Sequence, residues 1–185
     1  MDWEAKLAWA AGLAALMLDR QDEAGRWLRR GADEYRASWE IAPPGSWGRP
    51  IAALRCRLLA GDADGARLDA AWTLRVGALE AAGAIGGYAA VLALLALGRD
   101  ADAIPLAEAL RGRSDFPGDV ADALAALARG EPEAYAAAVG SVVRSFETRD
   151  AYLEDVPVAD TALVLQELAR ARGIAAEISS PLLPV

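Results

Sequence analysis

One short event recurs four times along this chain of 185 residues: an alanine- and leucine-rich stretch stops, one or two acidic residues follow, and another alanine-bearing stretch starts. Acidic side chains favour the first turn of a helix, and glycine or arginine favours its end, so each event is typical of a tight turn between helices. Glu23, Asp64, Asp102 and Glu133 align in these turns at uneven separations of roughly 30 to 40 residues, which predicts stacked helical hairpins without a strict repeat.

The whole chain, 1–185, is therefore predicted to be a single all-α domain of about nine helices. The antiparallel hairpins are expected to stack in the manner of tetratricopeptide (TPR-like) repeats or an α-solenoid, and residues 174–185 to form an extended C-terminal tail packed on them. No segment has the alternating, β-branched pattern of a strand. The expected helices are 2–18, 22–39, 51–60, 64–80, 88–97, 101–111, 117–129, 132–149 and 157–172, with 88–97 at the centre because apolar residues surround its axis.

Composition excludes several classes of protein. The longest apolar run, 88–97, is about half of what a bilayer span needs. The start of the chain carries Asp2 and Glu4 where a signal peptide would be basic, so we expect a cytoplasmic protein. The net charge of -8 arises entirely within residues 76–185, which argues against nucleic-acid binding and favours either a basic protein partner or a solvated acidic surface.

Histidine is absent from the chain. Its absence removes the usual general base, the commonest transition-metal ligand and the partner of a nucleophilic Ser or Cys. The one cysteine, Cys56, lies in an apolar helical stretch and is expected to be a buried core residue. We therefore expect no enzyme activity, no cofactor and no metal, although an enzyme based on carboxylates, Arg and Tyr stays open.

Trp39 and Trp47 flank a loop rich in proline and glycine, with Arg49 beside them. Tryptophan and arginine in an ordered loop are typical of a binding hot spot, so these three residues are candidates for contacting a partner, with loop packing as the alternative. The tryptophans at 3, 9, 27 and 72 are expected to be core residues. The glycines at 83, 86 and 87 resemble a phosphate loop only superficially, and close helix packing explains them better.

Asp150, Tyr152, Glu154 and Asp155 form a second candidate surface for a protein partner. Together with Glu147 and Asp160, these carboxylates could supply enough oxygen ligands for a hard cation. A metal site is nevertheless disfavoured, because Pro157 interrupts the segment and the chain has no histidine to complete the ligand set. Asp155 has a simpler alternative role, next to the exposed N–H groups at the start of the last helix.

The order of features in the last third of the chain is an acidic turn near Tyr135, a linker bearing Tyr152, an apolar helix ending in Arg172 and Gly173, and a terminal Leu-Pro. This order resembles the C-terminal part of the Imm49-type immunity proteins of bacterial polymorphic toxin systems, although the Leu183-Pro184 ending lacks the tyrosine of their Tyr-Leu-Pro. The resemblance implies a cytoplasmic, non-enzymatic bacterial protein that neutralises a toxin by binding it.

The residue pattern taken alone points to a non-catalytic helical-repeat protein that binds a protein partner or a second copy of itself, as an adaptor would, and the resemblance implies an immunity-type role. The alternative is a small molecule or lipid held within the helical stack.

Overall fold

The computed structural model describes residues 3–184 and is all-helical over that range. Nine α-helices and three short 3-10 turns are present there, and the described chain contains no strand. The helices are α1 Trp3–Met17, α2 Gln21–Ser38, α3 Gly48–Leu59, α4 Ala63–Arg75, α5 Ala84–Ala96, α6 Asp100–Arg111, α7 Gly118–Arg129, α8 Pro132–Glu147 and α9 Asp160–Arg170. The 3-10 turns are η1 Trp39–Ile41, η2 Ala78–Glu80 and η3 Leu153–Asp155.

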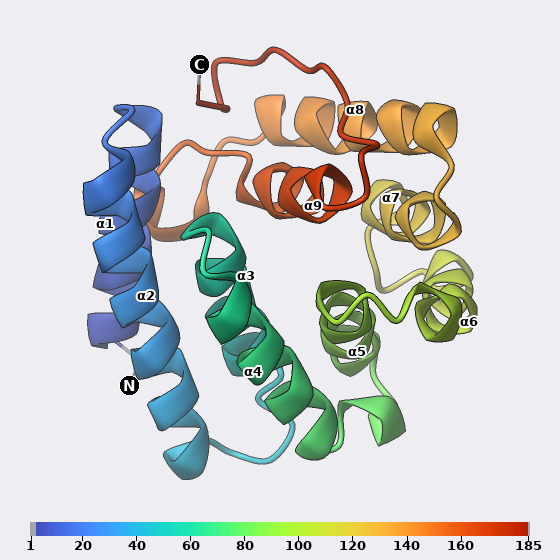
Figure 1. The fold of residues 1–185 in the computed structure, drawn as a ribbon, viewed down its shortest axis with the longest axis horizontal. Helices are drawn as coiled ribbons and strands as arrows, with labels where there is room; N and C mark the ends of the chain where they lie inside the picture. Colours follow the sequence, from blue (N-terminus) through green and yellow to red (C-terminus); the bar gives the residue numbers. More distant parts are fainter. Residues whose placement is uncertain (1–2, 185) are drawn as a thin grey trace.

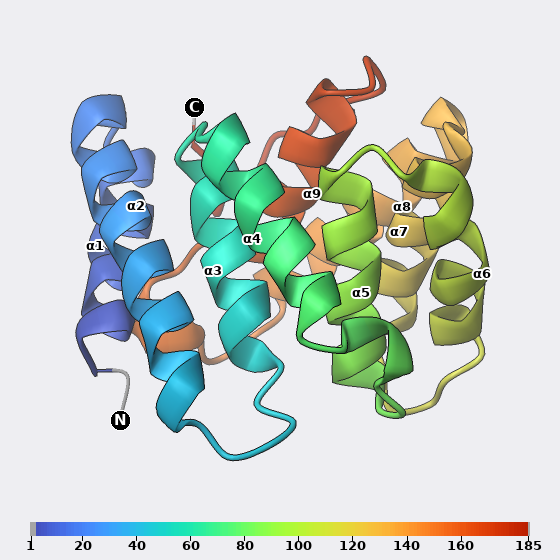
Figure 2. The same cartoon turned by 60° about the horizontal axis from the view of Figure 1, so that its bottom comes forward.

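Helices α1 to α8 follow one another as antiparallel neighbours, each packed against the next (Figures 1 and 2). The stack curves, and α9 returns into its concave side, where it contacts α3, α7 and α8 (Figure 1). The all-α hairpin stack predicted from the sequence is thus confirmed. The concave surface that an open stack would offer to a ligand is filled by the chain itself.

The recurring turns have the predicted chemistry. The first turns of α2, α4, α6 and α8 contain Glu23, Asp64, Asp102 and Glu133, respectively. Their negative charges interact favourably with the positive ends of the helix dipoles. Asp62 caps α4, accepting a hydrogen bond of 2.9 Å from the Gly65 N–H.

Three helix boundaries differ from the sequence prediction. Helix α3 begins at Gly48, inside the expected loop, because Pro50 falls in its first turn, where the missing N–H costs no hydrogen bond. Helix α4 ends at Arg75, since Gly77 adopts a left-handed conformation with φ 99° and reverses the chain. Helix α5 begins at Ala84 and contains Gly86, where a Cβ would lie 2.2 Å from the Cβ of Ala81. Close packing therefore explains Gly86, as expected.

The last helix also starts later than predicted, at Asp160 instead of Pro157. Asp155 lies in η3 with φ 58°, ahead of an extended segment, so its predicted role at the start of this helix is wrong. Gly173 follows the helix with φ 70°, as its position in the sequence predicts. The predicted start of the first helix at residue 2 lies outside the described residues.

Apolar side chains form two adjoining cores. The larger centres on α5, which is buried from Tyr88 to Leu95, and extends through α6 to α9; the predicted central position of this helix is confirmed. The smaller core joins α1, α2 and α3 to Val158 and Leu163. At Gly12 a Cβ would lie 2.6 Å from Leu28 Cγ, so only glycine lets α1 and α2 approach so closely. Within the described range, each helix falls short of the length or apolarity required to cross a bilayer.

Residues 174–184 are non-helical and pack against α8 and α9. The Gln166 side chain accepts a hydrogen bond from Ala176 N–H and donates one to its carbonyl, at 3.1 and 2.6 Å. Further along, Leu182 accepts a 2.9 Å bond from the Ala159 N–H. Polar as well as apolar contacts therefore hold the tail down.

Candidate functional site

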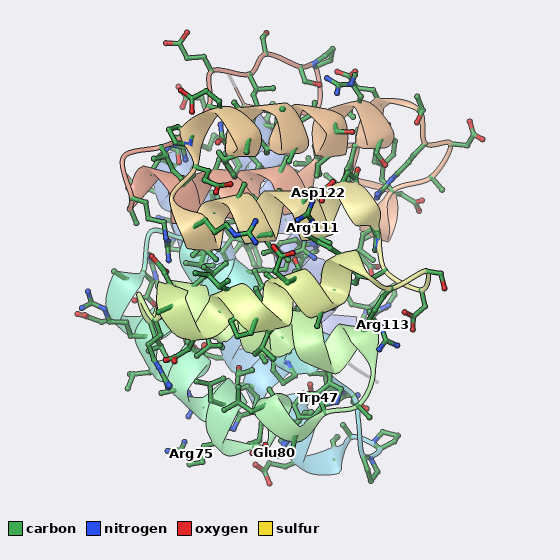
Figure 3. All side chains as sticks on the ribbon, turned by 90° about the vertical axis from the view of Figure 1, so that its right-hand side faces the viewer. Trp47, Arg75, Glu80, Arg111, Arg113 and Asp122 are labelled. Atoms are coloured by element: carbon green, nitrogen blue, oxygen red, sulfur yellow. The ribbon has the colours of Figure 1, made fainter. Side chains whose placement is uncertain are left out.

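The loop predicted to recognise a partner is an ordered aromatic cluster. The ring centroids of Trp39 and Trp47 are 5.4 Å apart, and Trp72 meets Trp39 edge-on at 6.0 Å. Trp47 is half-buried, packs on the larger core and lies beside Gly86 at the start of α5 (Figure 3). Arg49 donates a hydrogen bond to the Ser38 carbonyl. These contacts fix the loop, while its predicted role in partner binding remains a prediction.

The other tryptophans divide between core and surface. Trp9 and Trp72 are buried, as expected, and Trp27 is half-buried with the guanidinium of Arg30 5.9 Å from its ring centroid. Trp3 is 61% exposed, so its assignment to the core is wrong.

The predicted acidic surface is only partly free. Asp150 and Asp155 are exposed, Tyr152 donates a 3.2 Å hydrogen bond to the Phe146 carbonyl, and Glu154 pairs with Lys6 of α1 at 3.2 Å. This ion pair places the segment against the first helix, next to Leu7. Across residues 3–184, acidic and cysteine side chains nowhere gather as a group of three suited to a metal ion.

Asp160 is separate from those carboxylates and belongs to a buried polar cluster at the junction of α1, α3, α5 and α9. Its carboxylate lies 2.7 Å from Nη2 of Arg55, and the side chains are 7% and 13% exposed. The Arg55 guanidinium also lies 5.2 Å from the Trp9 ring centroid. Arg55 Nε, the Trp9 indole N–H and the Tyr88 hydroxyl have no hydrogen-bond partner among the described residues. Burial raises the pKa of Tyr88, partly offset by Arg55. All four side chains are buried or nearly so, and we interpret the cluster as structural.

The outward face of α1 is the least expected surface feature. Successive residues of a helix are rotated by about 100°, so positions 3, 7, 11, 14 and 18 follow one line along it. Nine positions on this side are exposed or half-buried. Seven of them are apolar, namely Trp3, Leu7, Ala10, Ala11, Ala14, Met17 and Leu18, and the charged Glu4 and Lys6 lie at the two margins. We call the seven apolar residues the α1 face. A helix that is apolar all round is normally covered on all sides, and this one stands at the edge of the stack (Figure 1).

A groove of about 400 Å³ extends the α1 face at its Trp3 end, between the start of α1 and the end of α2. Ile41, which is 80% exposed, lines it together with Trp3, Ala5 and Ala37. The aromatic loop thus borders one end of the face, and the acidic segment borders it at Lys6.

The low number of charged residues in the first helix could have revealed this surface from the sequence, although the periodicity of its apolar residues does not. Trp3–Met17 has only two charged residues, Glu4 and Lys6, whereas the neighbouring α2 has eight over Gln21–Ser38. A first helix with so few polar positions cannot turn a polar side to solvent.

Two other hollows have different linings. The widest, about 620 Å³, is an alanine-floored groove over α7 and α8, where Arg111 pairs with Asp122 at 2.7 Å and Arg129 pairs with Glu108 at 2.7 Å (Figure 3). Its charge is therefore largely neutralised. A smaller and more enclosed pocket of about 320 Å³ lies under the C-terminal tail. Apolar side chains of α1, α3, α9 and the tail line it, together with Gln21, Gln166, Glu167 and Arg170.

Comparison with known proteins gives no relative: no protein-family model matches the chain, and no curated protein or solved structure shows significant similarity to it.

Proposed function

We propose that this chain is a non-catalytic protein-binding module that docks a protein partner on the α1 face. The observation that carries the proposal is the uncovered apolar side of an edge helix. Terminal helices of a stack normally present polar side chains to water, and a contiguous apolar patch on a soluble protein marks an interaction surface. Trp3, Leu7 and Leu18 supply the large side chains on which such contacts depend.

The surroundings of the α1 face support the same proposal. Ile41 and Leu153, which are 80% and 55% exposed, lie on segments that border the face. Asp150 and Asp155 supply exposed charge on the second segment. An apolar centre with a charged rim is the usual composition of a protein interface.

The finer parts of the proposal rest on the sequence. A TPR-like adaptor role follows from the hairpin stack, and an immunity-type role against a bacterial toxin follows from the C-terminal pattern. We also propose a cytoplasmic location.

Site-specific photo-crosslinking in the native host tests the proposal. A photoreactive amino acid at Leu7, which is 51% exposed on the α1 face, should yield adducts with another polypeptide. The same group at Leu68, 67% exposed on α4, is the matched control and should not. Absence of adducts at position 7, or equal yields at both positions, would refute a binding role for this face.

The pocket beneath the tail favours a second function, binding of an apolar small molecule. Its volume of about 320 Å³ lies at the lower end of the range for ligand sites. Leu16, Leu59, Leu163 and Ile178 provide apolar walls, and Gln166 has its amide engaged by Tyr135 and Ala176. Native mass spectrometry of protein purified from its host should then show an added mass that denaturation releases. A spectrum of the bare chain alone would count against this function.

A further inference from the structure

The α1 face is suited to form the centre of an interface between two copies of the chain. Its three largest side chains, Trp3, Leu7 and Leu18, are 61%, 51% and 61% exposed. Stable specific interfaces begin at roughly 1,200 Å² of buried area in total, and Ile41 and Leu153, 80% and 55% exposed, add rim area to each face. The loop of Trp39 and Trp47 and the acidic segment 150–155 flank the face and provide a rim for such an interface.

The order of side-chain sizes along the face is self-complementary. Large residues stand at both ends, Trp3 and Leu7 at one and Leu18 at the other, and the small Ala10, Ala11 and Ala14 lie between them. A twofold axis between positions 10 and 11 sets the two alanines against each other, which lets the helix backbones approach closely. The same axis sets Leu7 against Ala14 of the second copy, a large residue against a small one.

The residues at the two ends of the α1 face are also complementary about that axis. Leu18 of the second copy falls opposite Trp3, beside the groove of about 400 Å³ between Trp3 and Ile41. Each copy therefore offers one exposed leucine and one groove for it, which is the reciprocal arrangement that a twofold interface requires. An antiparallel pair also opposes the two helix dipoles.

Charge favours a second copy over a basic partner at this face. Residues 1–75 contain eleven basic and eleven acidic side chains, so the net charge of -8 resides in the rest of the chain. Contact through α1 joins the two parts without net charge, and the antiparallel arrangement puts the acidic segment that borders each face at Lys6 at opposite ends of the pair, which limits repulsion between identical chains. A basic partner would gain more from the acidic part.

We propose that the occupant of the α1 face is a second copy of this chain, with the two α1 helices antiparallel about a twofold axis between Ala10 and Ala11. This inference rests on the proposed function and names the partner.

Sedimentation velocity over a range of concentrations tests it. Wild type should reach twice the chain mass of 19.4 kDa. Leu7→Glu places a charge against Ala14 of the second copy and should weaken dimerisation at least tenfold, while Leu68→Glu, at a more exposed leucine on α4, should leave it unchanged. A wild type that stays monomeric, or a Leu7→Glu variant that dimerises normally, overturns the proposal. Circular dichroism melts establish that both variants fold.

Oxidative crosslinking tests the orientation. Ala11→Cys sits next to the axis and should form a disulfide-linked dimer. Leu18→Cys should not, because an antiparallel pair separates the two copies of residue 18 by about 22 Å along the helices. The native Cys56 is buried and does not compete. Crosslinking through residue 18 overturns this arrangement: together with residue 11 it requires parallel helices, and without residue 11 it requires an axis close to residue 18.

The outcomes separate this inference from the proposed function. A monomeric wild type whose position 7 crosslinks to a different polypeptide in the host refutes the second copy and retains a protein-binding face. A monomer without any adduct refutes both.

Discussion

Removing the charge of Asp160 should strongly destabilise the fold, because it leaves a buried guanidinium without its counter-ion. Arg55 and Asp160 are 13% and 7% exposed, and the indole of Trp9 covers the guanidinium. Breaking a buried ion pair from one side costs about 3–5 kcal/mol. Against a total stability of about 5–15 kcal/mol for an ordinary domain, this is a large fraction. At about 2–4 °C per kcal/mol for a chain of this length, Asp160→Asn should melt roughly 6–20 °C below wild type.

The matched double variant separates the charge effect from packing. Arg55→Met combined with Asp160→Leu replaces both partners by apolar groups of similar volume, which is often neutral or stabilising. We expect it to recover most of the stability lost in Asp160→Asn. Asp122→Asn, which breaks an exposed pair with Arg111 (Figure 3), is the control and should melt nearly as wild type does.

Urea titrations followed by circular dichroism at 222 nm provide the measurement, since they give free energies of unfolding from one cooperative transition. A loss below about 1 kcal/mol in Asp160→Asn would show that Arg55 reaches water or another acceptor when its partner is neutral. A double variant as unstable as the single one would show that side-chain shape at this junction, and not charge, dominates.

Other measurements check the remaining structure. Deleting 174–185 should lower the melting temperature, since the tail covers apolar residues of α9; an unchanged melt would contradict the packed tail. Trp47→Ala should cost about 2–3 kcal/mol, less than a fully buried tryptophan, and a loss below 1 kcal/mol in the same urea titration would favour a purely recognitional role. Burial raises the pKa of Tyr88, Tyr135 and Cys56, so the folded state keeps protons that the unfolded chain releases. Stability should therefore be unaffected below about pH 8 and fall above about pH 9–10 by about 1.4 kcal/mol per pH unit for each group; a flat stability curve to pH 11 would refute this.

Helix number, turn chemistry and the central helix could be predicted from the sequence because each depends on neighbours close along the chain. A carboxylate such as Glu133 and an apolar run such as that of α5 act locally. Boundaries failed where tertiary contact overrides local preference. In the sequence Gly86 interrupts a helical pattern, but the structure requires it inside α5, because Ala81 and Trp47 leave no room for a Cβ.

The sites were harder to predict for the same reason. The loop of Trp39 and Trp47 and the segment around Glu154 were chosen for composition, and the structure shows contacts that no spacing in the sequence reveals: a tryptophan cluster and an ion pair with Lys6. The exposure of Trp3 depends on which side of α1 meets α2, and Gly12 and Leu28 decide that.

The return of α9 into the stack has a consequence for how the chain folds during synthesis. Arg172, just after α9, donates hydrogen bonds of 2.7 Å to the carbonyls of Leu95 and Leu168 and pairs with Asp100. Open helical repeats fold from neighbour to neighbour and tolerate the loss of a terminal unit. Here α3 meets its α9 partner only after a further hundred residues or so have been made, a long loop to close. A nascent chain on the ribosome therefore exposes the inner surfaces of α3 and α7 until α9 has emerged, which makes the docking of α9 the step that commits the chain to its native state.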